Sequence, residues 1–444
     1  MKRFWRSFFL TRRAFIVGWL LVLLFVAGWF SPAIFGLARA AALLVVGVIV
    51  LELLILFRTR SAIRGERHTF GKWSNGDENP VTIVLRSWYG IRVHVRVLDE
   101  LPHQFQRRDL AFEGELDGGG ELRFPYAVRP VTRGVYSFGA INVLASLATG
   151  LVERRFVLEA GKEVAVYPSF LQLRKYELLA ISDRLTMAGV KRIRRIAQHV
   201  EFDRIKEYVP GDDRRTVNWK ATARRGRLMV NLYQDERSQQ VFSLIDLGRV
   251  MKMPFEGLSL LDYAINASLV ISNIAMHKDD KAGLITFSDK VDTVLRASRQ
   301  RGQMEKILEQ LYAQRTDHRE TDMEALYANV KTQISQRSLL LLFTNYESVN
   351  AMRRQLPFLQ RLARTHLLVV IFFQNTELED DLKRHPTNTV ELYTHTITEK
   401  HMYEKRLIAK ELEGHGITSI LTRPQDLTVN VINKYLAIKA RGSL

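Results

Sequence analysis

The sequence predicts a multi-domain protein in which an N-terminal two-helix membrane hairpin precedes an antiparallel β-sandwich and a doubly wound α/β domain. Two long apolar runs near the N-terminus predict the hairpin, because each has about the length of a helix that crosses a bilayer. Short alternating runs of apolar and polar residues, separated by turns, predict the sandwich. From residue 240 onward, apolar runs of strand length alternate with amphipathic runs of helix length, which is typical of a mostly parallel sheet covered by helices.

The composition excludes several classes of protein. The chain has 444 residues, 47% of them hydrophobic, which suits more than one folded domain. It has no cysteine, which excludes a disulfide framework, thiolate metal sites and a cysteine nucleophile. The net charge is +18. Residues 1–67 contribute much of this positive excess, because they hold ten basic and two acidic side chains. Because nearly half of the excess lies beside the apolar runs, it indicates a membrane surface rather than nucleic acid.

Residues 1–67 predict a cytoplasmic tail and two transmembrane helices, at about 14–35 and 40–57. Basic residues flank both outer ends of the pair, whereas the connecting loop holds only Arg39, so the positive-inside rule places both termini in the cytoplasm. This topology predicts an inner-membrane protein. A cleaved signal peptide ending near Ala38–Ala40 is the alternative. For Glu52, inside the second run, we expect snorkelling or an ion pair with Arg58.

Residues 68–168 predict the β-sandwich, and the glycines at 118–120 indicate a hairpin turn rather than a phosphate-binding loop. A connecting region, 169–239, follows. It contains a basic cluster, Lys191–Arg195, which is either a solvated helix face or a contact for anionic lipid or an acidic partner. Nucleic acid binding is not expected, because no aromatic residues interleave the cluster.

Residues 240–444 predict the doubly wound α/β domain. The expected strands are 241–246, 282–287, 291–296, 339–345, 366–373 and 417–422. In such sheets ligands bind beyond the carboxyl ends of the strands. Asp246 ends the first strand and Asn345 follows a central one, so we expect both residues at that rim.

Two resemblances extend this prediction. The strand and helix order, with an acidic residue ending the first strand and Thr321 near the start of a later helix, resembles the von Willebrand factor type A fold. Residues 201–230 resemble the core of the bacterial family called domain of unknown function 58 (DUF58). The residues that match are Glu201, Phe202, Glu207, Tyr208, Pro210, Gly211, Asp212, Asn218, Trp219, Lys220, Thr222, Ala223 and Arg224. Members commonly carry two membrane helices, a β-sandwich and a type A domain, so the resemblance covers the whole chain.

The same block has a physical interpretation of its own. Residues 210–213 form a strong turn, since proline fixes φ and glycine permits positive φ, and the turn joins two extended stretches. One reading places Trp219 in a core and the neighbouring charges in a local salt-bridge network. The other reading is a partner-binding loop.

The type A resemblance also implies positions for a metal site. Carried onto this chain, the positions that hold Mg²⁺ in metal-binding type A domains read Asp246, Gly248, Val250, Thr321 and Asn345. Two serine hydroxyls and one carboxylate of that pattern are missing, so we expect no metal and no other cofactor. We expect Arg249 to pair with Asp246 in place of the cation. A retained Mg²⁺ site is the alternative.

The leading functional hypothesis is a non-enzymatic docking protein of the inner membrane. The family resemblance implies a partner, a MoxR-type AAA+ ATPase that acts in the assembly or activation of other complexes. The chain contains no phosphate-binding loop, zinc-protease motif or nucleophile elbow. The alternatives are a metal-dependent ligand-binding or adhesion module outside the cell, which needs the opposite topology, and a hydrolase with no recognised nucleophile.

Overall fold

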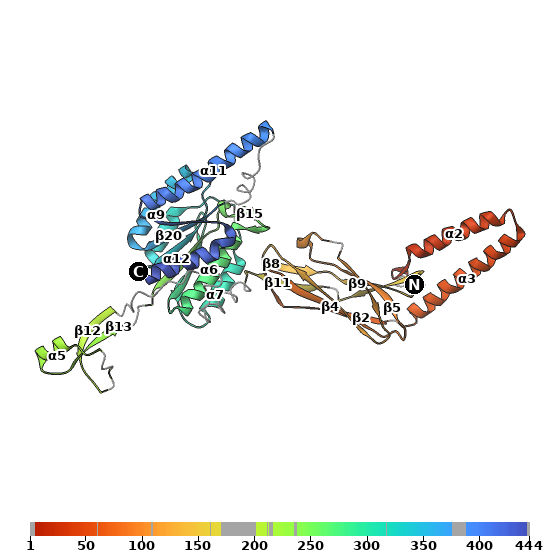
Figure 1. The fold of residues 1–444 in the computed structure, drawn as a ribbon, viewed down its shortest axis with the longest axis horizontal. Helices are drawn as coiled ribbons and strands as arrows, with labels where there is room; N and C mark the ends of the chain where they lie inside the picture. The colour runs from red at the N-terminus through yellow and green to blue at the C-terminus, as the bar shows by residue number, and fades with distance from the viewer. Residues whose placement is uncertain are drawn as a thin grey trace. The chain divides into compact units, whose positions relative to one another are not determined.

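The computed structural model of the protein describes residues 5–59, 61–107, 110–159, 161–169, 201–210, 212, 216–234, 238–316, 318–374 and 388–441 (Figure 1). The chain divides into two units, Met1–Tyr167 and Pro168–Leu444. The basic cluster at 191–195 lies outside the described residues, as do Gly211 and Asp213 of the predicted turn.

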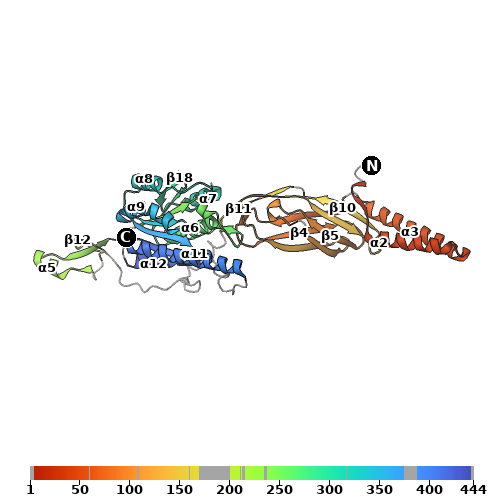
Figure 2. The same cartoon turned by 90° about the horizontal axis from the view of Figure 1, so that it is seen from above.

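The first unit begins with two helices, α2 (Arg12–Gly28) and α3 (Pro32–Phe57), which lie side by side (Figures 1 and 2). Only Trp29–Ser31 connects them, so the connection lies earlier in the chain than the predicted 36–39, and the prediction that the first helix runs to about residue 35 is wrong. Proline at the first helical position and the Ala- and Leu-rich segment after it favour an early start of α3. Gly28 permits the close packing, since a Cβ there would lie 2.9 Å from the Cα of Phe35. In the described part of the chain, α3 alone is long and apolar enough to cross a membrane.

The rest of this unit is built from antiparallel sheets. Strands pair in the orders β1-β10-β9-β5-β6, β2-β4-β7 and β3-β11-β8, and β3 with β11 is the parallel pair among those described. Alternate residues of β4 and β5 are buried, which confirms the period of two in the sequence. The elements are β1 (Phe8–Leu10), β2 (Ile63–Thr69), β3 (Lys72–Ser74), β4 (Asn79–Ser87), β5 (Val93–Asp99), η1 (His103–Phe105), β6 (Ala111–Leu116), β7 (Glu121–Val128), β8 (Gly134–Phe138), β9 (Ile141–Ser146), β10 (Val152–Leu158) and β11 (Lys162–Tyr167).

The helices and the sheets are not separate domains with a boundary at residue 68. Strand β2 starts at Ile63 and pairs with β4, so the predicted boundary falls inside it. Strand β1, expected to belong to a tail, pairs with β10. The strand was hidden in the sequence because Arg64 occupies an exposed position and Arg67, although charged, occupies a buried one, so no alternation of apolar and polar residues is visible.

Glu52 differs from the expectation of snorkelling or pairing with Arg58. Its carboxylate is buried and accepts hydrogen bonds from the backbone N–H of Leu151 (3.1 Å) and Val152 (2.6 Å) and from the Thr149 hydroxyl. Buried carboxylates need such donors, and the loop before β10 supplies them. The last turns of α3 are therefore bonded to the sheets of the same unit.

The core of this unit also holds an ion pair between two fully buried side chains, Arg67 and Asp99. The Arg67 Nε donates to Asp99 Oδ2 (3.2 Å), and Nη2 donates to Oδ1 and to the Gly139 carbonyl (3.3 Å). The Tyr126 hydroxyl donates to Asp99, and burial together with that carboxylate raises the pKa of Tyr126. The Arg67 guanidinium also stacks 4.2 Å from the centre of the Phe138 ring.

The second unit contains a mixed sheet of order β18-β17-β14-β19-β20-β21, in which β18 runs antiparallel and the others are parallel. Helices α6, α7 and α12 cover one face, and α8, α9 and α11 cover the other (Figure 1). The strands are β14 (Gln240–Asp246), β15 (Pro254–Phe255), β16 (Leu258–Ser259), β17 (Lys281–Phe287), β18 (Val291–Ser298), β19 (Leu339–Phe343), β20 (Leu367–Phe373) and β21 (Thr418–Thr422). The helices are η4 (Arg249–Met251), α6 (Leu260–His277), α7 (Gln303–Ala313), α8 (Met323–Gln333), α9 (Val349–Thr365), α11 (Thr389–Gly414), η5 (Pro424–Asp426) and α12 (Leu427–Ala440). Each strand predicted from residue 240 onward is confirmed.

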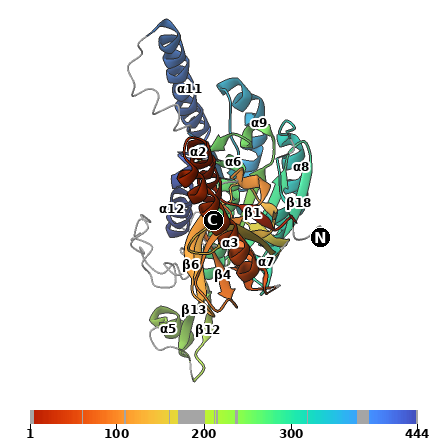
Figure 3. The same cartoon turned by 90° about the vertical axis from the view of Figure 1, so that its right-hand side faces the viewer.

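The DUF58-like block forms a hairpin of β12 (Glu201–Glu207) and β13 (Met229–Gln234) with a short helix, α5 (Trp219–Arg225), between them (Figure 3). The prediction of an extended stretch after the turn is therefore wrong for the residues that form α5. Asn218 caps this helix by accepting a hydrogen bond from Ala221 N (3.0 Å). Trp219 is 73% exposed, so the prediction that it packs in a core is also wrong. It lies in the first turn of a two-turn helix that has little beside it to bury an indole.

Candidate functional site

Asp246, Thr321 and Thr344 meet at the carboxyl ends of β14 and β19, where the sequence predicted a site. The Thr321 hydroxyl lies 2.8 Å from both carboxylate oxygens of Asp246. The Thr344 hydroxyl donates to Oδ2 (2.6 Å), and the backbone N–H of Gly248 donates to Oδ1 (2.8 Å). Asp246 is fully buried, and both of its oxygens accept hydrogen bonds from the chain itself.

Gly248 is required at this site for steric reasons. A Cβ at this position would lie 2.6 Å from the Thr321 hydroxyl and 3.0 Å from the Asp246 carboxylate. Any side chain there would push Thr321 away from Asp246. Gly248 occupies a position that carries a serine in the metal-binding pattern. Here the glycine favours the arrangement in which Thr321 bonds directly to Asp246.

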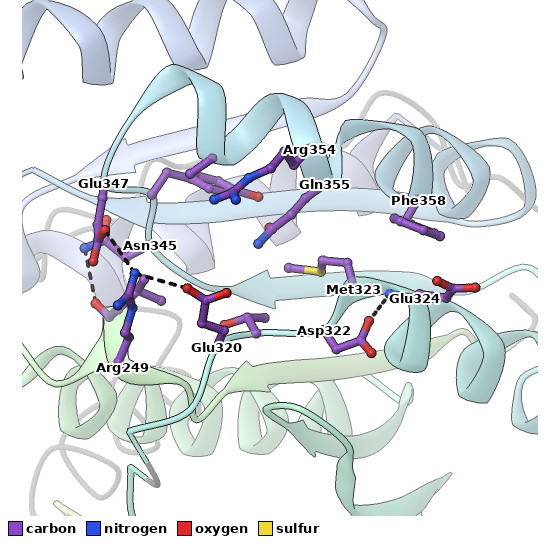
Figure 4. Close-up of a pocket in the computed structure, with 14 residues that line it drawn as sticks. Arg249, Glu320, Asp322, Met323, Glu324, Asn345, Glu347, Arg354, Gln355 and Phe358 are labelled. Carbon is purple, nitrogen blue, oxygen red and sulfur yellow. Dashed lines mark hydrogen bonds and ion pairs between the residues drawn. The ribbon is translucent and has the colours of Figure 1, made fainter.

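Arg249 does not pair with Asp246 as the sequence led us to expect. Its guanidinium is half exposed and lies 3.4 Å from Glu320 and 3.6 Å from Glu347 (Figure 4). Asp246 is sealed at the strand end, where small hydroxyls reach it, whereas a guanidinium is better solvated at the surface. Arg249 therefore bridges two surface carboxylates.

Asn345 is held on both sides. Its Nδ2 donates to the Val250 carbonyl (3.4 Å), and its Oδ1 accepts a hydrogen bond from Lys405 Nζ (2.5 Å). Lys405 comes from α11 and is only 5% exposed, and burial lowers its pKa to about 8, an effect that nearby Glu347 partly opposes. Sequence reasoning missed Lys405, although it occupies a place in the buried stripe of α11 with Met402, Ile408 and Leu412.

These residues do not make a suitable cage for Mg²⁺, which requires near-octahedral oxygen ligands. The carboxylate oxygens of Asp246 already accept three donors, and an ammonium group occupies Asn345 Oδ1. Within the described ranges, no group of three His, Asp or Glu side chains is placed to hold a metal ion. The chemistry available at the rim is therefore that of hydrogen bonds and ion pairs.

A pocket of about 270 Å³ opens beside Asp246, between the rim and the helices α8 and α9 (Figure 4). Its lining residues are Arg249, Val250, Glu320, Thr321, Asp322, Met323, Glu324, Asn345, Tyr346, Glu347, Ala351, Arg354, Gln355 and Phe358. Four carboxylates and two guanidinium groups thus surround it. One of the carboxylates, Asp322, caps α8 by accepting hydrogen bonds from Glu324 N (2.8 Å) and Ala325 N (3.1 Å).

Two buried polar atoms in the pocket wall have no hydrogen-bond partner among the described residues, the Tyr346 hydroxyl and Gln355 Oε1. Tyr346 is 1% exposed, and its ring packs against Phe372 with 5.7 Å between centroids. Burial, with the nearby Asp246 charge, raises the pKa of Tyr346, so its hydroxyl keeps its proton. Leaving such a group unpaired costs about 1–3 kcal/mol. Neither residue was singled out from the sequence, which carries no signal of an unpaired atom.

The residues of the DUF58-like block make contacts within their own hairpin. The Thr222 hydroxyl donates to the Asn218 carbonyl (2.8 Å) and accepts from Met229 N (3.0 Å), so both residues hold α5 on β13. Lys206 pairs with Asp212 (2.8 Å), which is the predicted local ion pairing. The side chains of Glu201 and Phe202 lie outside the described residues. The exposed residues of α5 are Trp219, Lys220, Ala223, Arg224 and Arg225.

One known protein family matches the part of the chain that holds this site. Residues 204–380 match the family model described as "Protein of unknown function DUF58". The DUF58 match contains every residue that lines the pocket, and it ends before Lys405. It covers residues 204–230 of the segment on which the sequence resemblance rested, and it leaves out Glu201 and Phe202.

One curated relative is the uncharacterized protein YeaD of Bacillus subtilis (strain 168), which is 27% identical over 251 residues. The match covers 52% of this chain and 61% of YeaD, so it spans less than two thirds of that protein.

Solved structures show more distant likeness. The conserved hypothetical protein BatB from Bacteroides thetaiotaomicron aligns with 46% of this chain and 100% of its own, with 9% identity and a TM-score of 0.31. The CARDB domain of PF1109 from Pyrococcus furiosus, solved in complex with di-metal ions, aligns with 23% of this chain and 91% of its own, with 15% identity and a TM-score of 0.17.

Proposed function

We propose that the protein is a membrane-anchored docking protein, not an enzyme, and that it captures a protein partner at the rim pocket without a metal ion. The observation that carries this proposal is the state of Asp246. Its oxygens are bonded to the chain's own donors, while the adjoining pocket remains open and charged. A rim of this kind presents side chains for recognition rather than a Lewis acid or a nucleophile.

The membrane anchor in this proposal is the N-terminal helix pair, which leaves both termini in the cytoplasm. Helix α3 has 26 residues, or about 39 Å, which exceeds the roughly 30 Å of a hydrocarbon core. The excess corresponds to the last turns from Glu52 onward, whose carboxylate is bonded to the sheets. The basic flanks favour the bacterial inner membrane.

The partner that the family resemblance implies is a MoxR-type AAA+ ATPase. The DUF58 match contains the whole pocket lining, so the proposed docking surface lies within the matched region. The alternative of a metal-dependent module outside the cell needs a carboxylate that is free to bind a cation and the opposite topology. The bonded state of Asp246 speaks against it.

A binding experiment with purified components tests the proposal. The full chain, tagged and held in detergent micelles, is incubated with a purified MoxR-type ATPase from the same organism. We expect saturable binding that Ala351→Arg abolishes, because Ala351 lines the pocket on the first turn of α9. Thr332→Arg, on the exposed end of α8, is the matched control and should bind as the unaltered chain does. Absence of saturable binding, or equal binding by both variants, contradicts the proposal.

A further inference from the structure

The rim pocket has the charge pattern of a site for a basic side chain. Four acidic residues line it, Glu320, Asp322, Glu324 and Glu347, against two arginines, Arg249 and Arg354. The surplus is negative even though the protein as a whole carries +18. A cationic group would therefore be favoured here against the general charge of the molecule.

The two unpaired buried atoms in the pocket wall favour a ligand that donates hydrogen bonds. Gln355 Oε1 can only accept, and the Tyr346 hydroxyl can also accept through its oxygen. Gln355 extends from α9 into the space above the rim (Figure 4). Because these two atoms are a hydroxyl and an amide oxygen, they are an observation independent of the carboxylates.

The chain already places a guanidinium at the edge of this pocket. Arg249 lies between Glu320 and Glu347 at 3.4 and 3.6 Å, longer than in a well-formed ion pair, and it is about half exposed. Such surface pairs are weak and exchange readily. Glu320 and Glu347 at the pocket edge can therefore bind a guanidinium, and they hold that of Arg249 only weakly.

The size and the walls of the pocket suit one long side chain. At about 270 Å³ it lies below the range of pockets for drug-sized ligands. Met323, Val250 and Phe358 supply apolar surface along which an aliphatic stem can pack. An aromatic ring in the wall also favours a planar cation.

We propose that the pocket binds an arginine side chain of the protein partner, which displaces Arg249 from the two carboxylates. This inference deepens the docking function proposed above and rests on it. Arginine fits better than lysine because its five N–H donors lie in one plane and can bond both oxygens of a carboxylate at once. The site thus selects a basic residue, where a bound divalent cation would select an acidic one.

The test uses short fluorescent peptides with the full chain in detergent micelles. The peptides are Ala-Arg-Ala and its analogues with citrulline, lysine or glutamate in the centre, all with blocked ends. Citrulline keeps the shape of arginine and removes its charge. We expect the arginine peptide to bind and the citrulline peptide to bind about tenfold more weakly, since charge-assisted hydrogen bonds are lost.

Tyr346→Phe separates a binding role from a structural one. Because the Tyr346 hydroxyl is buried without a partner in the free protein, its removal relieves a desolvation penalty and should raise the unfolding temperature, while it weakens binding of the arginine peptide several-fold. Tyr435→Phe is the matched control, since its buried hydroxyl donates to Asp280 (2.5 Å) away from the pocket lining. It should lower the unfolding temperature and leave peptide binding intact.

Three results overturn the inference. They are equal binding of the arginine and citrulline peptides, preferential binding of the glutamate peptide that Arg354→Gln removes, and no binding of the arginine peptide at millimolar concentration. If the ATPase still binds and Ala351→Arg still blocks it, only the choice of arginine has failed. If the ATPase does not bind either, the docking function itself has failed.

Discussion

Each of the two units holds an arginine paired with acidic side chains, Arg67 with Asp99 in one and Arg249 with Glu320 and Glu347 in the other, and the two clusters differ in burial. Arg67 and Asp99 are fully buried, with Tyr126 and the Gly139 carbonyl as further partners. Arg249 is half exposed between Glu320 and Glu347, and its contacts are long. A buried cluster fixes one arrangement of the core, because no water can replace a lost partner. An exposed cluster can exchange a partner at small cost, which is what a docking surface requires.

The largest expected effect comes from breaking the buried cluster. Asp99→Ala leaves the Arg67 guanidinium buried without its carboxylate, which should lower the free energy of unfolding by about 3–5 kcal/mol. The measurement is the urea concentration at which the N-terminal unit of the full chain becomes sensitive to protease. Glu121→Ala is the control, because its pair with Arg86 (2.9 Å) is solvent-accessible and contributes little to stability. Equal losses for the two variants would remove the distinction between the clusters.

A second prediction concerns Lys405, the buried cation behind the rim. Its pKa falls from an ordinary 10.5 to about 8 in the folded state through burial. Below pH 8 the amine is protonated in both the folded and the unfolded state, and the folded state bears the full cost of burying the charge. Above pH 8 the unfolded chain binds more protons, so stability rises as the pH climbs toward 10.5, by about 3 kcal/mol in total.

Lys405→Met isolates this contribution. The free energy of unfolding of the unaltered chain, relative to that of Lys405→Met, should increase between neutral pH and pH 10.5. The measurement is urea unfolding of both proteins at each pH. Glu347 and His401 face the same region, so Glu347→Gln is the variant that checks their influence. A difference that stays flat with pH contradicts the lowered pKa.

Asp246→Ala should have an intermediate effect. It removes the acceptor for Thr321, Thr344 and Gly248 N and should lower the free energy of unfolding by about 1–3 kcal/mol. The measurement is thermal unfolding of the C-terminal unit within the full chain. The control is Asp292→Ala, an exposed residue of β18. No loss of stability in Asp246→Ala would indicate that the carboxylate is not sealed by its neighbours.

The smallest effect on stability is expected at the exposed cluster. Arg249→Ala should change the free energy of unfolding by less than about 1 kcal/mol, and it should strengthen binding of the arginine peptide by freeing Glu320 and Glu347. Arg353→Ala, which removes an exposed pair with Glu411 (2.8 Å), is the matched control and should leave peptide binding unchanged. Weaker peptide binding in Arg249→Ala would mean that Arg249 is part of the site rather than its occupant.

Sequence patterns were sufficient for the elements of the α/β domain, because apolar runs such as β19 and β20 are buried on both faces and bounded by polar residues. They also placed Asp246 and Asn345 at one rim, since parallel strands bring their carboxyl ends together. They did not predict the partners. Glu52 bonds to residues about 100 positions away, and Lys405 of α11 reaches Asn345 in the loop after β19. Periodicity reports which face is buried, but not which neighbour lies there.

The central claim, that the rim acts without a metal ion, is tested most directly by calorimetric titration of Mg²⁺ and Mn²⁺ into the full chain in detergent. Asp246 bonded to Thr321 and Thr344 predicts no saturable heat below millimolar metal, and none that depends on Asp246. Saturable binding at micromolar affinity that is lost in Asp246→Ala would contradict the account and would show that the rim is a working metal site.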